Sequence, residues 1–302
     1  METVLLTGAT GFLGSHLLEG LLKENYKVLI IKRTFSNTWR IKRLLRKVQS
    51  YNIDTVSLER VFQDNKIDIV IHAATIYGKI GEDSAVIIES NLLLPVKLLD
   101  LSISHSIDSF FNTDSFFNTA DLNYEYLGRY SLSKKQLVEW LKLSSDKIQI
   151  VNLKLEHLYG PKDSNNKFVL WLIKEYINNK EELKLTSGDQ KRDFLYVSDA
   201  VNAFIITLKN RKLLSKYSEF EVGTGESICI RDFAIEVKNV VSAVSAREVD
   251  TYINCGAIPY REGELMDSKA DNVALRKLGW DWSVSLEEGL KNTIKDTLNI
   301  RE

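Results

Sequence analysis

The chain has 302 residues, of which 44% are apolar, so it can bury a substantial core in one large domain or two modest ones. Its 40 basic and 41 acidic side chains nearly cancel, so no overall field recruits nucleic acid or an acidic membrane, and any phosphate site must be local. Two cysteines and four scattered histidines lack disulfide or metal spacing. We therefore expect a cytoplasmic protein with no metal centre, no secretory signal and no membrane span.

Short apolar runs alternate with amphipathic stretches through the first half of the chain. We expect strands at 3–8, 27–32, 67–74, 108–114 and 148–156, and helices at 15–26, 91–103 and 130–144. Continuous apolar strands separated by helices are typical of a parallel sheet that is covered on both faces. The pattern predicts an α/β fold of the Rossmann type, with a doubly wound parallel sheet.

The rhythm changes after residue 157. A polar loop at 158–167 is followed by short strands, turns and helices such as the one expected at 285–298. We predict a Rossmann domain over residues 1–157 and a smaller mixed α/β lobe over residues 158–302. The lobe would mainly bind substrate, and some elements after residue 195 would return to the first domain.

The stretch TGATGFLG, residues 7–14, lies between the first expected strand and the first expected helix. Glycines at this spacing permit a tight turn and a close approach of the backbone, so that a cofactor pyrophosphate can lie on the helix N-terminus. A merely structural turn is the alternative. The predicted cofactor contacts here are Gly8, Thr10, Gly11, Phe12, Leu13 and Gly14.

The second expected strand ends in Lys32 and Arg33, about 20 residues past the glycines. A carboxylate at this point would bond the ribose 2′-hydroxyl of NAD, whereas a cation accommodates the 2′-phosphate of NADP. The two residues favour NADP, although they could also simply end a strand at the surface.

Residues 110–118 read FFNTDSFFN, a polar cluster between two aromatic pairs. Asn, Asp and Ser favour turns, so the cluster is either the end of a strand running into a turn or a group of site residues. Tyr130 and Lys134 follow, four residues apart and therefore on one face of a helix. Alone, that pair is common on protein surfaces.

Taken together, these motifs resemble those of the extended short-chain dehydrogenases/reductases that act as sugar-nucleotide epimerases, dehydratases and reductases. The likeness runs nearly end to end, through TGATGFLG, IVIHAA, Asn91, NTDS, YSLSK, LYGP, RDFLYVSDA, YREGE and LGW. Within that family FNTDSFF, YSLSK, LEHLYGP and GDQKRDFLYV look most like the CDP-abequose synthase and CDP-paratose synthase type of 4-ketoreductase.

The resemblance implies roles for individual residues. Thr113 would bond the reacting carbonyl, Tyr130 would transfer the proton, and Lys134 would hold the nicotinamide ribose and lower the tyrosine pKa. The implied cofactor contacts are Ala73, Ala74, Asn91, Tyr130 and Lys134. The implied substrate contacts are Thr75, Tyr77, Asp114, Ser115, His157, Arg192 and Arg261.

Some of these substrate assignments keep an alternative. Arg192 and Arg261 match arginines that grip the substrate diphosphate, but each could form an ordinary ion pair with the adjoining Asp193 or Glu262. His157 stands where many relatives have Asn, and it is either structural or a substrate contact. We expect Asp199 to cap the helix that follows it rather than to touch substrate.

Departures from the family pattern narrow the predicted reaction. Related 4,6-dehydratases carry Thr-Asp-Glu where this chain has Thr113, Asp114 and Ser115, so elimination of water is not expected. Neither cysteine lies near this strand end, as the epimerase-reductases of the GDP-fucose synthase type would require. Carbonyl reduction and 4-epimerisation through a transient ketone remain.

We therefore predict NADPH-dependent reduction of the 4-keto group of a nucleotide-linked deoxy sugar for bacterial surface polysaccharide, such as O-antigen or capsule. The substrate would be a CDP-4-keto-dideoxyhexose or a GDP-4-keto-6-deoxyheptose. A 4-epimerase with bound NAD and a non-catalytic NADP(H)-binding sensor are the alternatives. The resemblance also implies a homodimer through the helices expected at 91–103 and 130–144.

Overall fold

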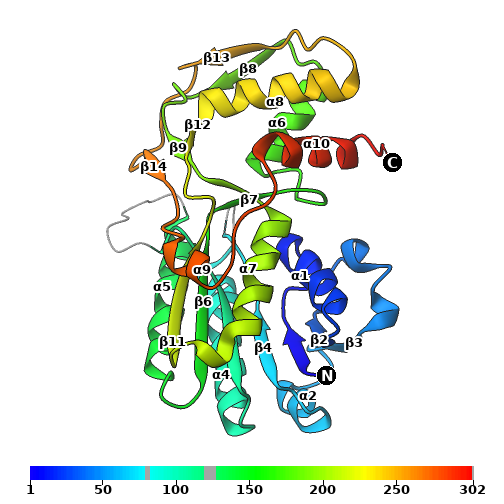
Figure 1. Ribbon diagram of the computed structural model, residues 1–302, viewed down its shortest axis with the longest axis vertical. Coiled ribbons are helices and arrows are strands. Elements are labelled where there is room, and N and C mark those ends of the chain that lie inside the picture. The colour runs from blue at the N-terminus through cyan, green and yellow to red at the C-terminus, as the bar shows by residue number, and fades with distance from the viewer. Residues whose placement is uncertain (79–81, 119–126, 301–302) are drawn as a thin grey trace.

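A seven-stranded parallel sheet forms the centre of the molecule (Figure 1). The computed structural model describes residues 1–78, 82–118 and 127–300. The strands lie in the order β11-β6-β5-β4-β1-β2-β3, and every neighbouring pair is parallel. Their bounds are β1 Thr3–Leu6, β2 Lys27–Lys32, β3 Gln49–Asn52, β4 Ile69–His72, β5 Ser109–Ser115, β6 Gln149–Leu155 and β11 Tyr217–Val222. This order confirms the predicted Rossmann-type fold.

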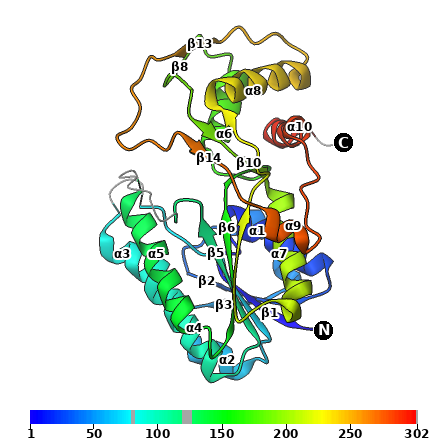
Figure 2. The same ribbon diagram turned by 60° about the vertical axis from the view of Figure 1, so that its left-hand side comes forward.

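Helices cover both faces of the sheet (Figure 2). Leu6 of β1 packs in one apolar core with Leu17 and Phe204, whereas its neighbour Leu5 packs in another with Leu98. Successive side chains of a strand point to opposite faces, which is why this apolar strand needs a cover on each side. One face carries α1 Phe12–Lys23 and α7 Val197–Asn210, and the other carries α2 Leu58–Asp64, α4 Leu94–Ser104 and α5 Gly128–Leu143. In the described chain no helix is both long and apolar enough to cross a bilayer.

A mixed α/β lobe with its own apolar core sits above the carboxyl ends of the strands (Figures 1 and 2). Its helices are α6 Phe168–Ile177, α8 Ile230–Ser245 and α10 Leu286–Thr297. Its short strands are β7 His157–Tyr159, β8 Glu182–Leu185, β9 Lys191–Arg192, β10 Phe194–Tyr196, β12 Ile228–Cys229, β13 Tyr252–Cys255 and β14 Asp267–Ser268. β11 and α7 follow residue 195 in the sequence but lie in the sheet layer of the first domain. The division of the chain at residue 157 stays a prediction.

Two local expectations differ from the structure. The helix expected at 91–103 begins with a π-helical turn, Glu89–Leu93, that continues α3 Ser84–Ile88 into α4. Asp199 does not cap a helix, because α7 begins two residues before it. Its carboxylate instead accepts hydrogen bonds from Ser283 and from the backbone of Val284, and so fastens the segment before α10.

Candidate active site

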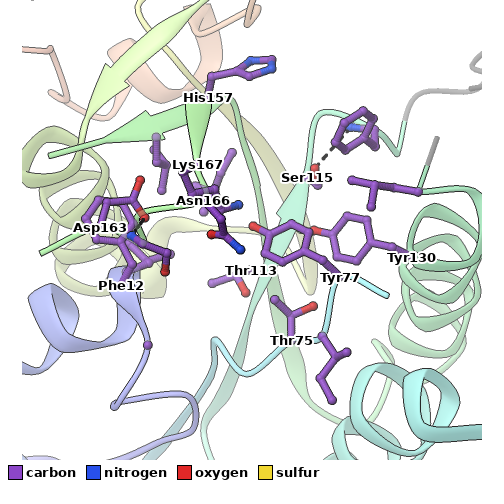
Figure 3. Close-up of a pocket in the computed structure, with 18 of the residues that line it drawn as sticks. Phe12, Thr75, Tyr77, Thr113, Ser115, Tyr130, His157, Asp163, Asn166 and Lys167 are labelled. Carbon is purple, nitrogen blue, oxygen red and sulfur yellow. Dashed lines mark hydrogen bonds between the residues drawn. The ribbon is translucent and has the colours of Figure 1, made fainter. Parts of the chain in front are cut away.

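A cavity of about 960 Å³ lies between the carboxyl ends of the strands and the lobe (Figure 3). All predicted site residues except Asn91 line it. They are Gly8, Thr10, Gly11, Phe12, Leu13, Gly14, Lys32, Arg33, Ala73, Ala74, Thr75, Tyr77, Thr113, Asp114, Ser115, Tyr130, Lys134, His157, Arg192 and Arg261. Binding clefts in open parallel sheets occur at this edge.

The glycine turn forms one end of the cavity. Gly8 has a φ of +68°, and a Cβ there would lie 2.5 Å from the carbonyl carbon and oxygen of Ala73. A Cβ on Gly14 would overlap the carbonyl oxygen of Gly8. The helix α1 then begins at Phe12 without a side-chain cap, so its first backbone N–H groups can receive an anion. The turn therefore fits a dinucleotide pyrophosphate.

The two predicted cations lie at the end of β2, Lys32 as its last residue and Arg33 at the start of the turn that follows. The backbone N–H of Arg33 donates to Ser36 Oγ at 3.0 Å, and the Arg33 guanidinium lies 5.7 Å from the ring centre of Phe35. The N–H of Thr34 donates to the Asp54 carboxylate at 2.7 Å, and this hydrogen bond lowers the pKa of Asp54. A fixed turn thus holds Lys32 and Arg33 on the cavity wall.

Arg40 is a residue of this region that sequence reasoning missed. Its guanidinium donates to the carbonyl oxygens of Lys162 at 2.8 Å and of Thr10 at 3.4 Å. It therefore ties the glycine turn to the loop that leads into the lobe. The basic stretch around residue 40 was visible in the sequence, but Thr10 and Lys162 lie 30 and 122 positions from Arg40, so no local pattern indicates these contacts.

Thr113, Tyr130 and Lys134 meet on one side of the cavity. Thr113 Oγ1 donates to the carbonyl oxygen of His72 at 3.0 Å, and Lys134 Nζ donates to the carbonyl oxygen of Thr113 at 2.8 Å. Tyr130 and Lys134 are one turn apart on the buried face of α5. The pair is therefore buried in the cavity wall and is not a pair of exposed surface residues.

The pKa of Tyr130 is raised, whereas Lys134 was expected to lower it. Burial raises the pKa of Tyr130 well above its ordinary value, and Tyr77, whose ring stacks on it with centres 4.9 Å apart, adds to the effect. Lys134 Nζ is directed to the Thr113 carbonyl, 6.0 Å from the Tyr130 ring centre. Burial also lowers the pKa of Lys134 to about 8, although Asp114 opposes this. Tyr130 thus holds its proton at neutral pH, as a proton donor must.

The polar cluster is the end of β5, which runs into a turn at residues 116–117 that the N–H of Asn118 closes on the carbonyl oxygen of Ser115 at 2.8 Å. Thr113, Asp114 and Ser115 also line the cavity, so the strand end is at the same time part of the site. Asp114 is buried, and burial raises the pKa of its carboxyl group. Its Oδ2 accepts hydrogen bonds from the side-chain amides of Asn118 and Asn152 at 2.8 and 3.0 Å. Ser115 Oγ accepts from the N–H of Phe117 at 3.4 Å (Figure 3). Substrate contacts by Asp114 and Ser115 stay predictions.

Asn91 is fully buried and supports the cavity wall from behind. Its amide donates to the carbonyl oxygen of Ile76 and to Ser133 Oγ, and its oxygen accepts from the N–H of Ile76 and from Thr75 Oγ1. The side chain joins the loop after β4 to α5. A direct cofactor contact by Asn91 stays untested.

Tyr77 faces a cation that sequence reasoning also missed. Figure 3 shows the rings of Tyr77 and Tyr130 side by side, with Asn166 and Lys167 on the other side of Tyr77. Lys167 Nζ lies 3.8 Å from the Tyr77 ring centre, within cation–π range. The only signal in the sequence was the polar loop at 158–167.

The lobe contributes the two predicted arginines. Arg192 is buried and forms an ion pair with Glu264, and it also donates to the carbonyl oxygen of Leu265. Asp193, the acid that adjoins it in sequence, instead accepts hydrogen bonds from the 224–225 turn. Arg261 is exposed and lines the same end of the cavity. Diphosphate binding by both arginines stays a prediction.

The chain is similar in sequence to enzymes that act on nucleotide sugars. A family model described as the NAD dependent epimerase/dehydratase family matches residues 4–223. The CDP-abequose synthase of Salmonella typhimurium is 36% identical over 300 residues, which cover 97% of this chain and 98% of that protein. The CDP-abequose synthase of Salmonella muenchen is 34% identical, with 97% of each protein covered. A putative UDP-glucose 4-epimerase of Methanocaldococcus jannaschii is 24% identical, with 96% of this chain and 97% of that protein covered.

Solved structures with the same fold include two nucleotide-sugar epimerases. The UDP-glucose 4-epimerase of Thermotoga maritima, with UDP-glucose, has a TM-score of 0.84 at 22% identity and covers 99% of this chain and 100% of that one. A UDP-glucuronic acid 4-epimerase of Bacillus cereus, with NAD and UDP-glucuronic acid, has a TM-score of 0.82 at 24% identity, with the same coverage. At these identities the likeness shows the fold alone.

Proposed function

The chain belongs to the NAD-dependent epimerase/dehydratase family, and we propose that it uses NADPH to reduce the 4-keto group of a nucleotide-linked deoxy sugar. The substrate would be a CDP-4-keto-dideoxyhexose or a GDP-4-keto-6-deoxyheptose for bacterial surface polysaccharide. The observation that carries the proposal is that Thr113, Tyr130 and Lys134 share one cavity with the glycine turn. Ser115 in that cavity supplies no second acid for elimination.

The chemistry that the bound nicotinamide supplies is a hydride for C4 of the sugar. Tyr130 gives its phenolic proton to the oxygen of that carbon, so that a ketone and a proton donor become an alcohol and a phenolate. Thr113 turns its hydroxyl from the His72 carbonyl to the same oxygen and stabilises the charge as it forms. Lys134, fixed on the Thr113 carbonyl 6.0 Å from the Tyr130 ring centre, would hold the nicotinamide ribose.

Two regions of charge would hold the ends of the ligands. Lys32 and Arg33, on their fixed turn, would receive the 2′-phosphate and select NADP over NAD. Arg192 and Arg261 would bind the diphosphate of the sugar nucleotide, because a planar guanidinium matches phosphate oxygens.

A homodimer fits the outer face of α5. Leu132, Trp140 and Leu143 lie on one stripe of this helix and are 56%, 49% and 73% exposed. Gln136 and Glu139 are exposed between them, but apolar side chains that gather on one exposed helix face commonly mark contacts between proteins. We propose that the same stripe of a second copy covers them, which a two-fold axis permits.

Nicotinamide absorbance tests the function directly. NADPH and then NADH are incubated with a panel of CDP-, dTDP- and GDP-linked 4-keto-6-deoxy sugars. We expect stoichiometric oxidation of NADPH with one member. Interconversion of 4-hydroxy sugars on tightly held cofactor, without net oxidation, would instead identify a 4-epimerase. Cofactor binding without turnover of either kind would identify a sensor.

A further inference from the structure

Glu156 is a buried carboxyl group in the cavity wall, between β6 and β7, that the proposed mechanism does not use. Only 8% of its surface is exposed, and it lines the cavity. The hydroxyl of Ser268, from β14, lies 3.0 Å from its Oε1 and 2.8 Å from its Oε2 and can donate to either. Burial raises the pKa of Glu156 to about 8.

The charges around Glu156 come from several elements. Asp193 and Glu221 reinforce the upward shift of its pKa, whereas Ser268 and Arg192 oppose it. The Asp193 carboxylate is held by N–H groups of Thr224, Gly225 and Ala270, so this negative charge is fixed in place. Glu156 therefore stays protonated at neutral pH, although it is a glutamate with a cation nearby.

His157 is the next residue and the direct neighbour of this carboxyl group. Its Nδ1 lies 3.3 Å from Glu156 Oε2, and its ring packs on Phe116 with centres 4.2 Å apart. Burial, Arg192 and Lys167 lower the pKa of His157 well below its usual range. The side chain is still 27% exposed, but the two cations act in the same direction as burial. The contact with Glu156 is thus a hydrogen bond of a neutral ring and not an ion pair.

A neutral imidazole carries one proton, so one nitrogen donates and the other accepts. We infer that Glu156 is a positioning residue that selects which nitrogen of His157 carries the proton. It thereby decides whether Nε2 offers a donor or an acceptor to the nucleotide sugar. That a nucleotide sugar meets Nε2 rests on the proposed function, whereas the tautomer of the ring does not.

The two protonation states of Glu156 favour different tautomers of the neutral His157 ring. Protonated Glu156 donates from Oε2 to Nδ1 while Ser268 donates to Oε1, and Nε2 then carries the proton as a donor. Ionised Glu156 can only accept, so the proton moves to Nδ1 and Nε2 becomes an acceptor. The ring lines the cavity, and within the described chain no hydrogen bond is formed by Nε2. In the donor form it suits a carbonyl, diphosphate or ring oxygen of the substrate.

The ring state can be measured without any substrate. Long-range proton–nitrogen NMR spectra distinguish the two forms of a neutral histidine, and the chain has only four histidines, of which H157N identifies the signal of interest. We expect the proton of His157 to lie on Nε2 at pH 6 and on Nδ1 at pH 9. In Glu156→Gln the change should disappear. Glu221→Gln, the same substitution at a neighbouring acid that does not contact His157, should keep the change but move its midpoint to lower pH, because Glu221 raises the pKa of Glu156.

Kinetics test the consequence for binding. We expect the KM of the wild type for its nucleotide sugar to rise about tenfold between pH 6.5 and pH 9, the effect of one lost hydrogen bond. The KM of E156Q should stay flat. Any effect of Lys134 titration on kcat is common to both proteins.

A His157 ring with the same form at pH 6 and pH 9, or a change that persists in E156Q, would overturn the inference. So would a KM that rises equally in wild type and E156Q. If no nucleotide sugar is reduced, the proposed function fails, but the ring measurement still decides the role of Glu156. If E156Q does not fold, the midpoint of the ring change still decides: a lower midpoint in E221Q than in wild type supports Glu156 as the titrating group, and an equal midpoint contradicts it.

Discussion

Burial keeps the phenol of Tyr130 protonated, and this favours a proton donor over a base. Ketone reduction begins with such a donor, whereas oxidation of an alcohol begins with a phenolate. The contact with Tyr77 adds to the same direction. The protonated phenol beside Thr113 is consistent with the proposed reduction.

Tyr130→Phe should abolish turnover and leave NADPH binding largely intact. The ring remains to stack on Tyr77, but the proton donor is gone, and such donors contribute about 10²- to 10⁴-fold. Steady-state kcat, together with NADPH fluorescence titration, measures the two effects. Unchanged turnover in this variant would remove Tyr130 from the mechanism.

Thr113→Val should lower kcat by about 10²-fold or more, because one donor to the developing charge is lost. It also leaves the buried carbonyl oxygen of His72 without this partner, which should cost about 1–3 kcal/mol of stability. Thr113→Ser keeps the hydroxyl and serves as the control. Equal kcat in the valine and serine variants would contradict the role of the hydroxyl.

Glu156 should make the stability of the protein fall as pH rises. Between its ordinary pKa of 4.5 and its folded value of about 8, the unfolded chain is ionised here and the folded chain is protonated. Stability from this group is therefore fully present below pH 4.5 and is lost as pH rises to about 8, by about 1.4 kcal/mol per pH unit. Urea unfolding at pH 5 and pH 8 should show a smaller loss for Glu156→Gln than for wild type. Equal losses would contradict burial of a neutral acid.

Among single elements, the sequence predicted those parts of the site whose residues lie within one strand, turn or helix. The glycine turn and the Tyr130–Lys134 face of α5 follow from spacing within one segment. The roles of Asn91 and Glu156 do not, because they depend on partners far along the chain. Ser268 is 112 positions from Glu156, and no local pattern connects them. That β5 reaches Ser115 before the chain turns could be settled only by the neighbouring strands that pair with it.

The outer stripe of α5 should control assembly. Replacing Trp140 and Leu143 together by Lys should convert a dimer into a monomer, because two charges would be buried in the contact. Light scattering coupled to size exclusion measures the mass. Leu213→Lys, which changes an apolar side chain that is 80% exposed outside this helix, should leave the dimer intact. A double variant of unchanged dimeric mass would exclude this stripe.

For the whole molecule, the Rossmann layer was predictable because strands buried on both faces are continuous apolar runs. The polar edge strand β3, with the sequence QSYN, has no such run and was missed. The lobe was recognised only as a change of rhythm, since β9, β12 and β14 have two residues each and carry no periodicity. The cavity joins both parts, with the glycine turn at one end and Arg192 and Arg261 in the lobe.

Transfer of deuterium from NADPH labelled at C4 of the nicotinamide is the most direct test of the proposed reduction. After incubation with the keto sugar that the absorbance panel identifies, mass spectrometry and NMR locate the label in the product. We expect one deuterium at C4 of the sugar for each NADPH oxidised. A product whose C4 hydrogen does not derive from the added NADPH would contradict the proposed reduction. Conversion of a 4-hydroxy sugar into its C4 epimer without label from added NADPH would establish an epimerase.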